Sequence, residues 1–162
     1  MNTLIAYTTH HGATKNAAIY ISELLKSDSV EICDLRKNKP KLNEYDRIIL
    51  GASIHAGKIQ RRMKRFMHRN NKTLAEKEIG LYLCCMHTGD TAQKQFDDNY
   101  PEDLRQHAKA TAIVGGSFDF EAMNMMERAI VKKVANINES VNKIDKEKIE
   151  QFVKQLTAAE AK

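Results

Sequence analysis

No apolar run in the sequence approaches the ~20 residues that a membrane-spanning helix requires. Its 3 cysteines are an odd number, and two of them, Cys84 and Cys85, are adjacent. Such a set argues against a disulfide framework and for a reducing compartment. Met1 leads directly into a strand-like run, without a basic segment and a long apolar segment, so we expect no secretory signal peptide. These absences predict a cytoplasmic protein without a transmembrane helix.

Several motifs of known chemistry are also missing. The sequence contains neither G-x-x-x-x-G-K-[ST] nor G-x-G-x-x-G, which excludes the two common glycine-rich nucleotide motifs. Paired acids do not follow the first predicted strand, which disfavours a receiver domain. Its basic segments lack the interleaved aromatic residues of RNA-binding motifs, so we expect no nucleic-acid partner. Without a repeat, a low-complexity segment or a linker, residues 1–162 are predicted to form one domain.

The formal net charge is +5, and a positive balance favours anionic partners. Residues 58–72 contain no acid, and their cationic residues are Lys58, Arg61, Arg62, Lys64, Arg65, Arg69 and Lys72. The apolar side of a helix over 58–69 would pack on the rest of the fold and leave a basic outer face. We interpret this face either as a solvated surface or as a docking surface for an acidic partner. An anionic membrane is the third alternative, in which Arg61, Arg62, Arg65 and Arg69 would make the protein membrane-peripheral.

Short apolar runs alternate with helical patterns along the chain. Continuous apolar runs predict buried strands over residues 3–7, 30–35, 47–52, 79–86 and 110–115. Helical spacing predicts helices from Lys15 onward, with Thr14 as N-cap, and over 58–69, 101–107, 121–137 and 146–156. This alternation implies an α/β fold with a parallel sheet and helices on both of its faces.

In open α/β sheets, ligands bind beyond the carboxyl ends of the strands. Here the predicted strands are followed by TTHHGAT, SIHAGK, HTGDT and GSFDF, which are rich in hydroxyl groups, glycine or histidine. The first of these loops ends at a helix N-terminus, where unpaired backbone N–H groups attract anions. Threonine hydroxyls add donors, and Gly12 allows a close approach to the backbone. The loop therefore suits a monophosphate, and a polar turn with a capping threonine is the alternative.

Two segments resemble a known family. The segment Y-T-T-H-H-G-A-T lies between a predicted strand and a predicted helix. It resembles the phosphate loop of flavodoxins, which usually has the sequence S/T-x-T-G-x-T. D-R-I-I-L-G-A-S-I-H-A-G-K resembles their third strand and first flavin-flanking loop, and A-I-V-G-G-S-F-D-F points to the branch with bacterial quinone-dependent protoporphyrinogen oxidase. The resemblance covers residues 3–156. It implies a doubly wound, five-stranded parallel sheet of order 2-1-3-4-5, with helices on both faces and FMN at the switch point.

The resemblance also implies which residues bind FMN. The phosphate loop would consist of Thr9, His10, His11, Gly12, Ala13 and Thr14. One side of the flavin ring would be flanked by Ser53, Ile54, His55, Ala56 and Gly57, and the other by Met86, His87, Thr88, Gly89 and Asp90. Three features depart from ordinary flavodoxins: two histidines replace small hydroxyl residues, tryptophan is absent, and the net charge is positive.

The ring-flanking loops carry His55, Lys58 and His87 against a single acid, Asp90. Such groups stabilise the reduced, anionic flavin and raise its potential, and imidazoles supply protons near neutral pH. We therefore predict an FMN-dependent oxidoreductase that passes electrons between an organic substrate and a quinone or a redox partner protein. His55 and His87 are the candidate proton donors or flavin tuners. The alternatives are a non-catalytic electron carrier and a flavin-free interaction domain that uses the basic face.

Three other features have simpler interpretations. The loop histidines match no zinc signature, so we predict no metal site. Cys84 and Cys85 are expected to be small buried hydrophobic residues. An extension at about 117–142 separates the last predicted strand from the last helix, and it contains an apolar stripe of Met123, Met126, Ile130, Val134 and Ile137. This stripe is predicted to pack in the core or to contact a substrate, a quinone or a partner.

Overall fold

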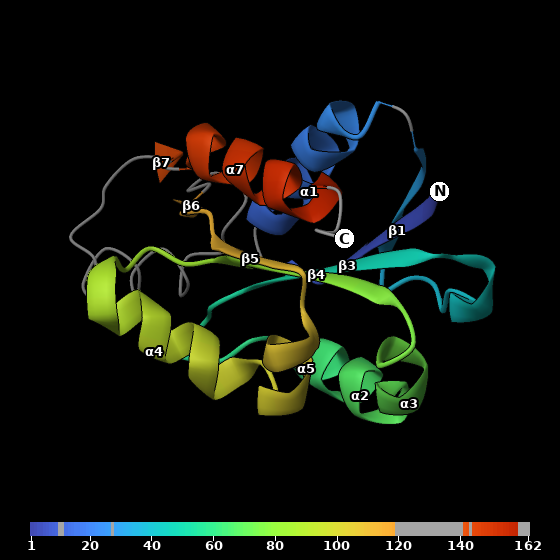
Figure 1. Cartoon of the computed structure of the whole chain (residues 1–162). Helices are drawn as coiled ribbons and strands as arrows, with labels where there is room; N and C mark the ends of the chain where they lie inside the picture. Colours follow the sequence, from blue (N-terminus) through green and yellow to red (C-terminus); the bar gives the residue numbers. More distant parts are fainter. Residues whose placement is uncertain (10–11, 27, 119–140, 143, 159–162) are drawn as a thin grey trace.

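The computed structural model describes residues 1–9, 12–26, 28–118, 141–142 and 144–158. One sheet is formed by β1 (Asn2–Tyr7), β2 (Ser29–Asp34), β3 (Arg47–Ser53), β4 (Glu78–Cys84) and β5 (Ala110–Ile113). The strand order is β2-β1-β3-β4-β5 and all neighbours are parallel (Figure 1). The predicted topology is thus confirmed, and the carboxyl ends of all five strands meet at one edge of the sheet.

Helices cover both faces of this sheet (Figure 1). One face carries α1 (Ala13–Leu24) and α7 (Lys146–Thr157), and the other carries α2 (Arg61–Arg69), α3 (Asn71–Leu74), α4 (Gly89–Asn99) and α5 (Glu102–His107). A short 3₁₀ helix, η1 (Leu42–Glu44), precedes β3. Beyond β5, β6 (Ser117–Phe118) pairs antiparallel with β7 (Val141–Asn142). None of the described helices combines the length and the apolar character needed to cross a membrane.

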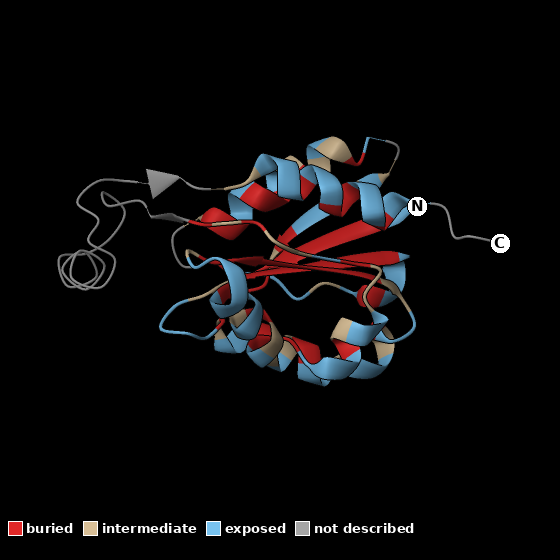
Figure 2. Ribbon diagram, turned by 60° about the vertical axis from the view of Figure 1, so that its left-hand side comes forward, coloured by how far each residue is buried: buried red, intermediate tan, exposed pale blue. Residues whose placement is uncertain are grey.

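The strands β1, β3 and β4 are buried on both faces because they are apolar over most of their length, as the red ribbons of Figure 2 show. The edge strand β5 is only partly buried. The buried strand predicted over 30–35 is wrong in its burial, because β2 lies at the other edge and most of its residues are exposed or half-buried. Successive side chains of a strand point to opposite faces, so Leu4 and Ile5 enter different cores. One core packs against α2 to α5 and includes Leu4, Leu50, Met63, Leu81 and Phe96. The other packs against α1 and α7 and includes Ile5, Ile21, Ile49, Tyr82 and Phe152. Each fully buried aliphatic or aromatic side chain stabilises the fold by about 1.5–3 kcal/mol.

Two predicted helix starts are wrong. The first helix begins at Ala13 with Gly12 as its N-cap, and Thr14 lies inside it, fully buried. Its hydroxyl donates to the backbone carbonyl of Thr8 and cannot cap the helix. The second helix begins at Arg61, because Lys58 takes part in a tight turn with His55 and Gln60 is extended.

The helices α3 and α4 and the 3₁₀ helix η1 were not predicted. Residues 87–91 were expected to be a loop, but Gly89 and Asp90 are the first two residues of α4. The helix buries only Ala92, Phe96 and Asn99, so its apolar spacing is too sparse to recognise in the sequence. The helix predicted over 121–137, with its apolar stripe, lies outside the described residues. In the sequence, β6 precedes that segment and β7 follows it, and the two strands pair with each other.

The amino ends of the strands are joined by ion pairs around Arg47, whose side chain is 5% exposed. Its guanidinium lies 2.5 Å from the Asp28 carboxylate before β2 and 2.7 Å from the Glu78 carboxylate of β4. Asp28 also accepts a hydrogen bond from the Thr3 hydroxyl of β1, and Lys109 before β5 lies 3.7 Å from Glu78. Ion pairs and one hydrogen bond thus connect the amino ends of all five strands, and we call this group of residues the ion-paired seam.

Candidate functional site

Every described residue with a positive φ angle lies beyond the carboxyl end of a strand of the main sheet. Gly12 follows β1, Ala56 and Gly57 follow β3, Gly89 follows β4, and Gly115 follows β5. Alanine is rarely found in this region, because its Cβ atom crowds the backbone. Backbone strain of this kind persists only where the surroundings hold it, and it clusters at binding sites. The four loops therefore form one specialised edge, as the sequence predicted.

The β1–α1 loop presents backbone donors at the start of α1. The φ angle of Gly12 is 92°, and its N–H donates to Thr9 Oγ1 over 2.8 Å. Thr14 Oγ1 donates to the Thr8 carbonyl over 2.6 Å and so ties the helix to the end of β1. No described side chain caps α1, so its first N–H groups are available to an anion. His10 and His11 lie outside the described residues, and their predicted role stays a prediction.

Open space adjoins this loop. A side-chain carbon added to Gly12 would meet no atom within 4 Å. In contrast, one added to Gly51 in β3 would lie 1.9 Å from the ring of Tyr82, whose hydroxyl donates to the Thr14 carbonyl. Tyr82 therefore holds the start of α1 from the buried side of the helix, whereas the space next to Gly12 is open. This arrangement fits a small anion held by backbone groups.

A glutamine joins the first loop to the second. Gln60 Oε1 accepts from the Thr8 hydroxyl over 2.8 Å, and Gln60 Nε2 donates to Ser53 Oγ over 3.0 Å. Because Gln60 immediately precedes α2, the same residue positions the end of β1, the end of β3 and the start of that helix. The sequence analysis missed Gln60, since a single amide before a helix carries no motif.

The second loop is a tight turn. His55 and Lys58 exchange backbone hydrogen bonds of 2.8 and 3.1 Å, and the two residues between them, Ala56 and Gly57, have φ angles of 51° and 78°. Positive φ at both central residues is the signature of a type I′ turn. His55, Ala56, Gly57 and Lys58 are all exposed, whereas Ile54 is half-buried. The turn therefore projects from the sheet edge, as a ring-flanking segment would.

Asn99, at the end of α4, holds this turn from the other side. Its Oδ1 accepts from the Ile59 N–H over 3.0 Å, and its Nδ2 donates to the carbonyls of Gly57 and Gln95 over 3.1 and 2.7 Å. The residue is only 6% exposed, so these bonds lie where water competes weakly. Asn99 lies far from the turn in sequence, and only the fold reveals its role.

The third loop borders a hollow of about 340 Å³. It is lined by Met86, His87, Thr88 and Gly89 from the end of β4, by Gly115 and Gly116 after β5, and by Asp145 and Lys148 at the start of α7. Asp145 caps α7 by accepting from the Lys148 N–H. His87, Thr88, Gly89 and Asp90 are exposed and Met86 is half-buried. A volume of this order falls in the range of small-ligand sites.

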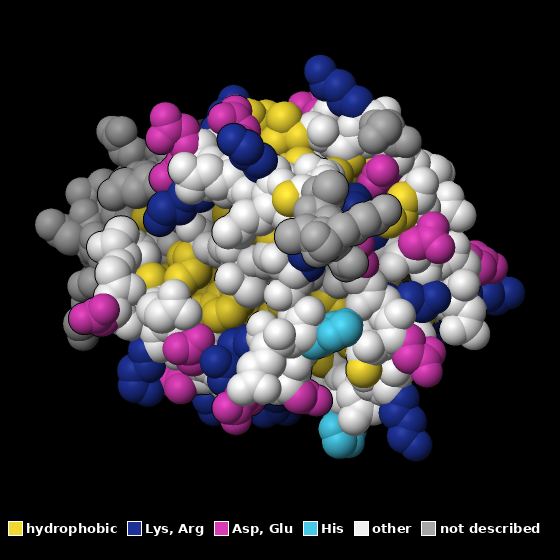
Figure 3. All heavy atoms as spheres, in the orientation of Figure 1, with side chains coloured by type: hydrophobic (Ala, Val, Ile, Leu, Met, Phe, Trp, Pro, Cys, Tyr) yellow, Lys and Arg dark blue, Asp and Glu magenta, His cyan; other side chains and the backbone are white. Residues whose placement is uncertain are grey.

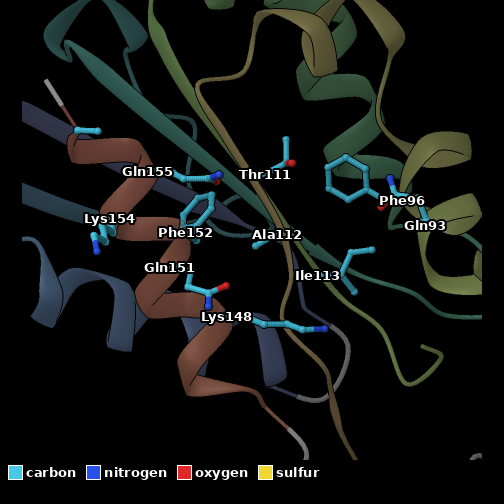
Figure 4. Close-up of a pocket in the computed structure, with 11 residues that line it drawn as sticks. Gln93, Phe96, Thr111, Ala112, Ile113, Lys148, Gln151, Phe152, Lys154 and Gln155 are labelled. Carbon is cyan, nitrogen blue, oxygen red and sulfur yellow. The ribbon is translucent and has the colours of Figure 1, made fainter. Parts of the chain in front are cut away.

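A larger hollow of about 700 Å³ continues from the first along the free edge of β5 (Figure 4). The two share Gln93, Ile113 and Lys148. Phe96 of α4 and Phe152 of α7 lie on opposite sides of β5. None of the described β1–α1 loop residues lines this space.

The two adjacent cysteines are free and buried, as predicted. Burial raises the pKa of both thiols, that of Cys84 far above its ordinary value, which disfavours the reactive thiolate. Cys85 Sγ lies 2.8 Å from Gln95 Oε1. Across the described part of the chain, no three His, Cys, Asp or Glu side chains are placed to share a metal ion.

The strand order, the helical layers and the converging loops define a doubly wound α/β domain. Ligands of such domains bind at the switch point of the strand order, which here lies between β1 and β3. A family model described as a flavodoxin domain matches residues 4–145, and the chain belongs to that family. The resemblance noted in the sequence is confirmed.

Individual relatives agree with this assignment. Protoporphyrinogen IX dehydrogenase [quinone] of Escherichia coli K12 is 27% identical over 85 residues, which are 51% of this chain and 47% of that protein. The chain thus matches about half the length of this curated relative. Flavodoxin 1 from Bacillus cereus superposes with a TM-score of 0.57 at 17% identity, over 96% of this chain and 97% of its own. The Streptococcus pneumoniae TIGR4 flavodoxin gives 0.58 at 17% identity, with the same coverage.

Proposed function

We propose that this protein is an FMN-binding flavoprotein that passes electrons between an organic substrate and a quinone or a partner protein. The observation that carries the proposal is the concentration of positive φ angles in the loops at one sheet edge of a flavodoxin-family domain. FMN combines a phosphate with a flat ring system. The sheet edge offers backbone N–H donors for the phosphate and two projecting loops for the ring system.

Each loop would have a separate task. The first N–H groups of α1, together with Gly12 and Thr9, would hold the phosphate. The 55–58 turn would flank one side of the ring, and residues 86–90 the other. When bound, FMN supplies the capacity to accept and release electrons. His55 and His87 would contribute positive or hydrogen-bonding groups beside it, and Asn99 and Gln60 would keep the loops in place.

The oxidoreductase reading is supported by the partial match to the E. coli dehydrogenase, whose name includes a quinone. It is also supported by the hollow beside residues 86–89 and its continuation along β5, which offer room for a second molecule next to the ring loops. A non-catalytic electron carrier is the second candidate, because the two flavodoxins superpose over nearly the whole chain.

The visible spectrum of the purified protein tests the cofactor. We expect flavin bands, and release of FMN on denaturation. Apoprotein should rebind FMN, and Gly12→Val should weaken the affinity at least tenfold, because a branched side chain at this φ angle strains the loop and fills the open space. Ser22→Val, which places the same side chain in the last turn of α1, should bind normally. A colourless protein that takes up no FMN would exclude both flavin functions and favour the interaction domain.

Turnover separates the enzyme from the carrier. Loaded protein is mixed anaerobically with protoporphyrinogen IX and a soluble quinone analogue. Catalysed oxidation of the first with reduction of the second supports the oxidoreductase. Protein that binds FMN and exchanges electrons with a reduced iron–sulfur protein, but catalyses neither reaction, is a carrier.

A further inference from the structure

We propose that the basic face of α2 is the docking surface for an acidic protein that exchanges electrons with the site, a proposal that rests on the proposed function. The basic face consists of Lys58, Arg61, Arg62, Arg65, Arg69 and Lys72, all of them exposed. Between residues 55 and 75 the sequence has no acid. On the face of the molecule seen in Figure 3, acidic and basic side chains are interspersed.

These cations are not neutralised within the described structure. The ion pairs found there use Arg36, Arg47, Lys94, Arg105 and Lys109 as cations, and no residue of the basic face. Lys64 differs from its neighbours, because it borders a hollow that is also lined by Asp97, Asp98 and Glu102. We therefore leave Lys64 out of the basic face. Unpaired cations concentrated on one side of a helix attract an anionic surface over about one Debye length, ~10 Å at 0.1 M salt.

The basic face lies directly beside the candidate site. Lys58 closes the turn that begins at His55, and Arg61 is the first residue of α2. Gln60, between them, binds both Thr8 and Ser53, so the start of the helix is tied to the first and second loops. A protein docked here would lie next to the turn proposed to flank the flavin ring. Electron exchange requires this proximity.

The composition of the helix favours protein over lipid. Helices that bind membranes bury an apolar face at the lipid boundary. The apolar side of α2 is already used, because Met63 and Met67 are buried against the sheet. The large hydrophobic side chains exposed in the described structure are Met1, Ile19 and Ile32, none of which is on α2. Four arginines remain, and their planar guanidinium groups suit the bidentate recognition of carboxylates.

The test uses reduced plant-type [2Fe–2S] ferredoxin, a small acidic carrier, as the probe. Stopped-flow absorbance follows reduction of the bound flavin, and titration calorimetry at low salt follows ferredoxin binding, with or without flavin. We expect the wild-type rate to fall about tenfold between about 20 and 200 mM NaCl. Arg61→Glu/Arg65→Glu should lower the low-salt rate and affinity at least tenfold. Lys26→Glu/Lys154→Glu, the same charge change just after α1 and in α7, should leave both near the wild-type values.

Each other outcome has a defined meaning. Equal losses in the two double variants, or no ferredoxin binding by the wild type, would overturn the docking proposal. Binding to phosphatidylserine vesicles that is lost in the arginine variant, with unchanged ferredoxin kinetics, would assign the face to a membrane. Absorbance reports the FMN content of every variant. Protein without FMN that still binds ferredoxin through α2 would refute the proposed function and leave the docking surface intact.

Discussion

At the scale of single residues, Thr14 ties the start of α1, through Thr8, to the end of the strand that precedes the proposed phosphate loop. Its hydroxyl is buried and already donates to the Thr8 carbonyl. We expect Thr14→Ala to weaken FMN binding about five- to tenfold, since a lost hydrogen bond of about 1 kcal/mol loosens the loop. Thr14→Ser keeps the hydroxyl and should bind almost normally. Fluorescence titration with FMN measures both, and equal affinity in Thr14→Ala and wild type would place the phosphate elsewhere.

Tyr45 predicts a specific response to alkaline pH. Its hydroxyl donates to the Glu31 carboxylate, and burial together with this contact raises its pKa to about 12, above the ordinary value of 10.0. The folded state therefore prefers the protonated form. The resulting stability is present below pH 10 and is lost as the pH rises through 12. Urea unfolding should show a fall in stability over this range that is smaller in Tyr45→Phe, and identical falls would contradict the assignment.

The sequence predicted residue types better than residue roles. Thr14 was recognised, but as the N-cap of the first helix, whereas its hydroxyl donates to the carbonyl of Thr8, just after β1. Gln60 and Asn99 were missed, since their partners lie on other elements. Hydrogen bonds between elements depend on the packing of the whole domain, and no local pattern encodes them.

At the scale of elements, α4 stabilises the turn after β3 through Asn99. Asn99→Ala leaves the buried N–H of Ile59 without its acceptor, which costs about 1–3 kcal/mol. We expect this loss in urea unfolding, together with weaker FMN binding. Asn70→Ala is the matched control, because Asn70 also donates from its side chain to a backbone carbonyl, that of Phe66, but at the end of α2. If both variants bind FMN equally well, the turn does not contact the flavin.

Elements with strong periodicity were predicted well, and those without it were not. The buried strands are short apolar runs, and α7 buries Ile149, Phe152, Val153 and Leu156 at helical spacing. In α4 the buried face includes an asparagine, a residue type that on its own is more typical of loops than of helices. The start of α2 was placed too early because the apolar Ile59 fits the helical pattern although the chain there is still extended.

At the scale of the whole molecule, we expect the charge around the proposed flavin site to set the redox potential of the flavin. His55→Glu or His87→Glu places a negative charge beside the proposed ring site, which disfavours the more negative, reduced flavin. We expect each to lower the two-electron potential by about 30 mV, the shift that corresponds to a tenfold change in equilibrium constant. His107→Glu, at the end of α5 and bonded to the Lys77 carbonyl, should change it little.

Redox titration of the wild type and the three variants measures these shifts. A strongly negative wild-type potential that none of the substitutions moves would favour a carrier and remove these histidines from the function. The global topology, in contrast, followed from the sequence, because alternating strands and helices leave few ways to bury both faces of a parallel sheet.

The ion-paired seam around Arg47 has a consequence for laboratory evolution. The amino ends of the strands hold the charge pairs, whereas the opposite edge holds the irregular backbone. The ion pairs and the proposed ligand loops therefore involve different residues. A library confined to residues 53–58 and 86–90 can search for new substrates while the seam preserves the scaffold. A library aimed at heat resistance can draw on the seam and leave the ligand loops unchanged.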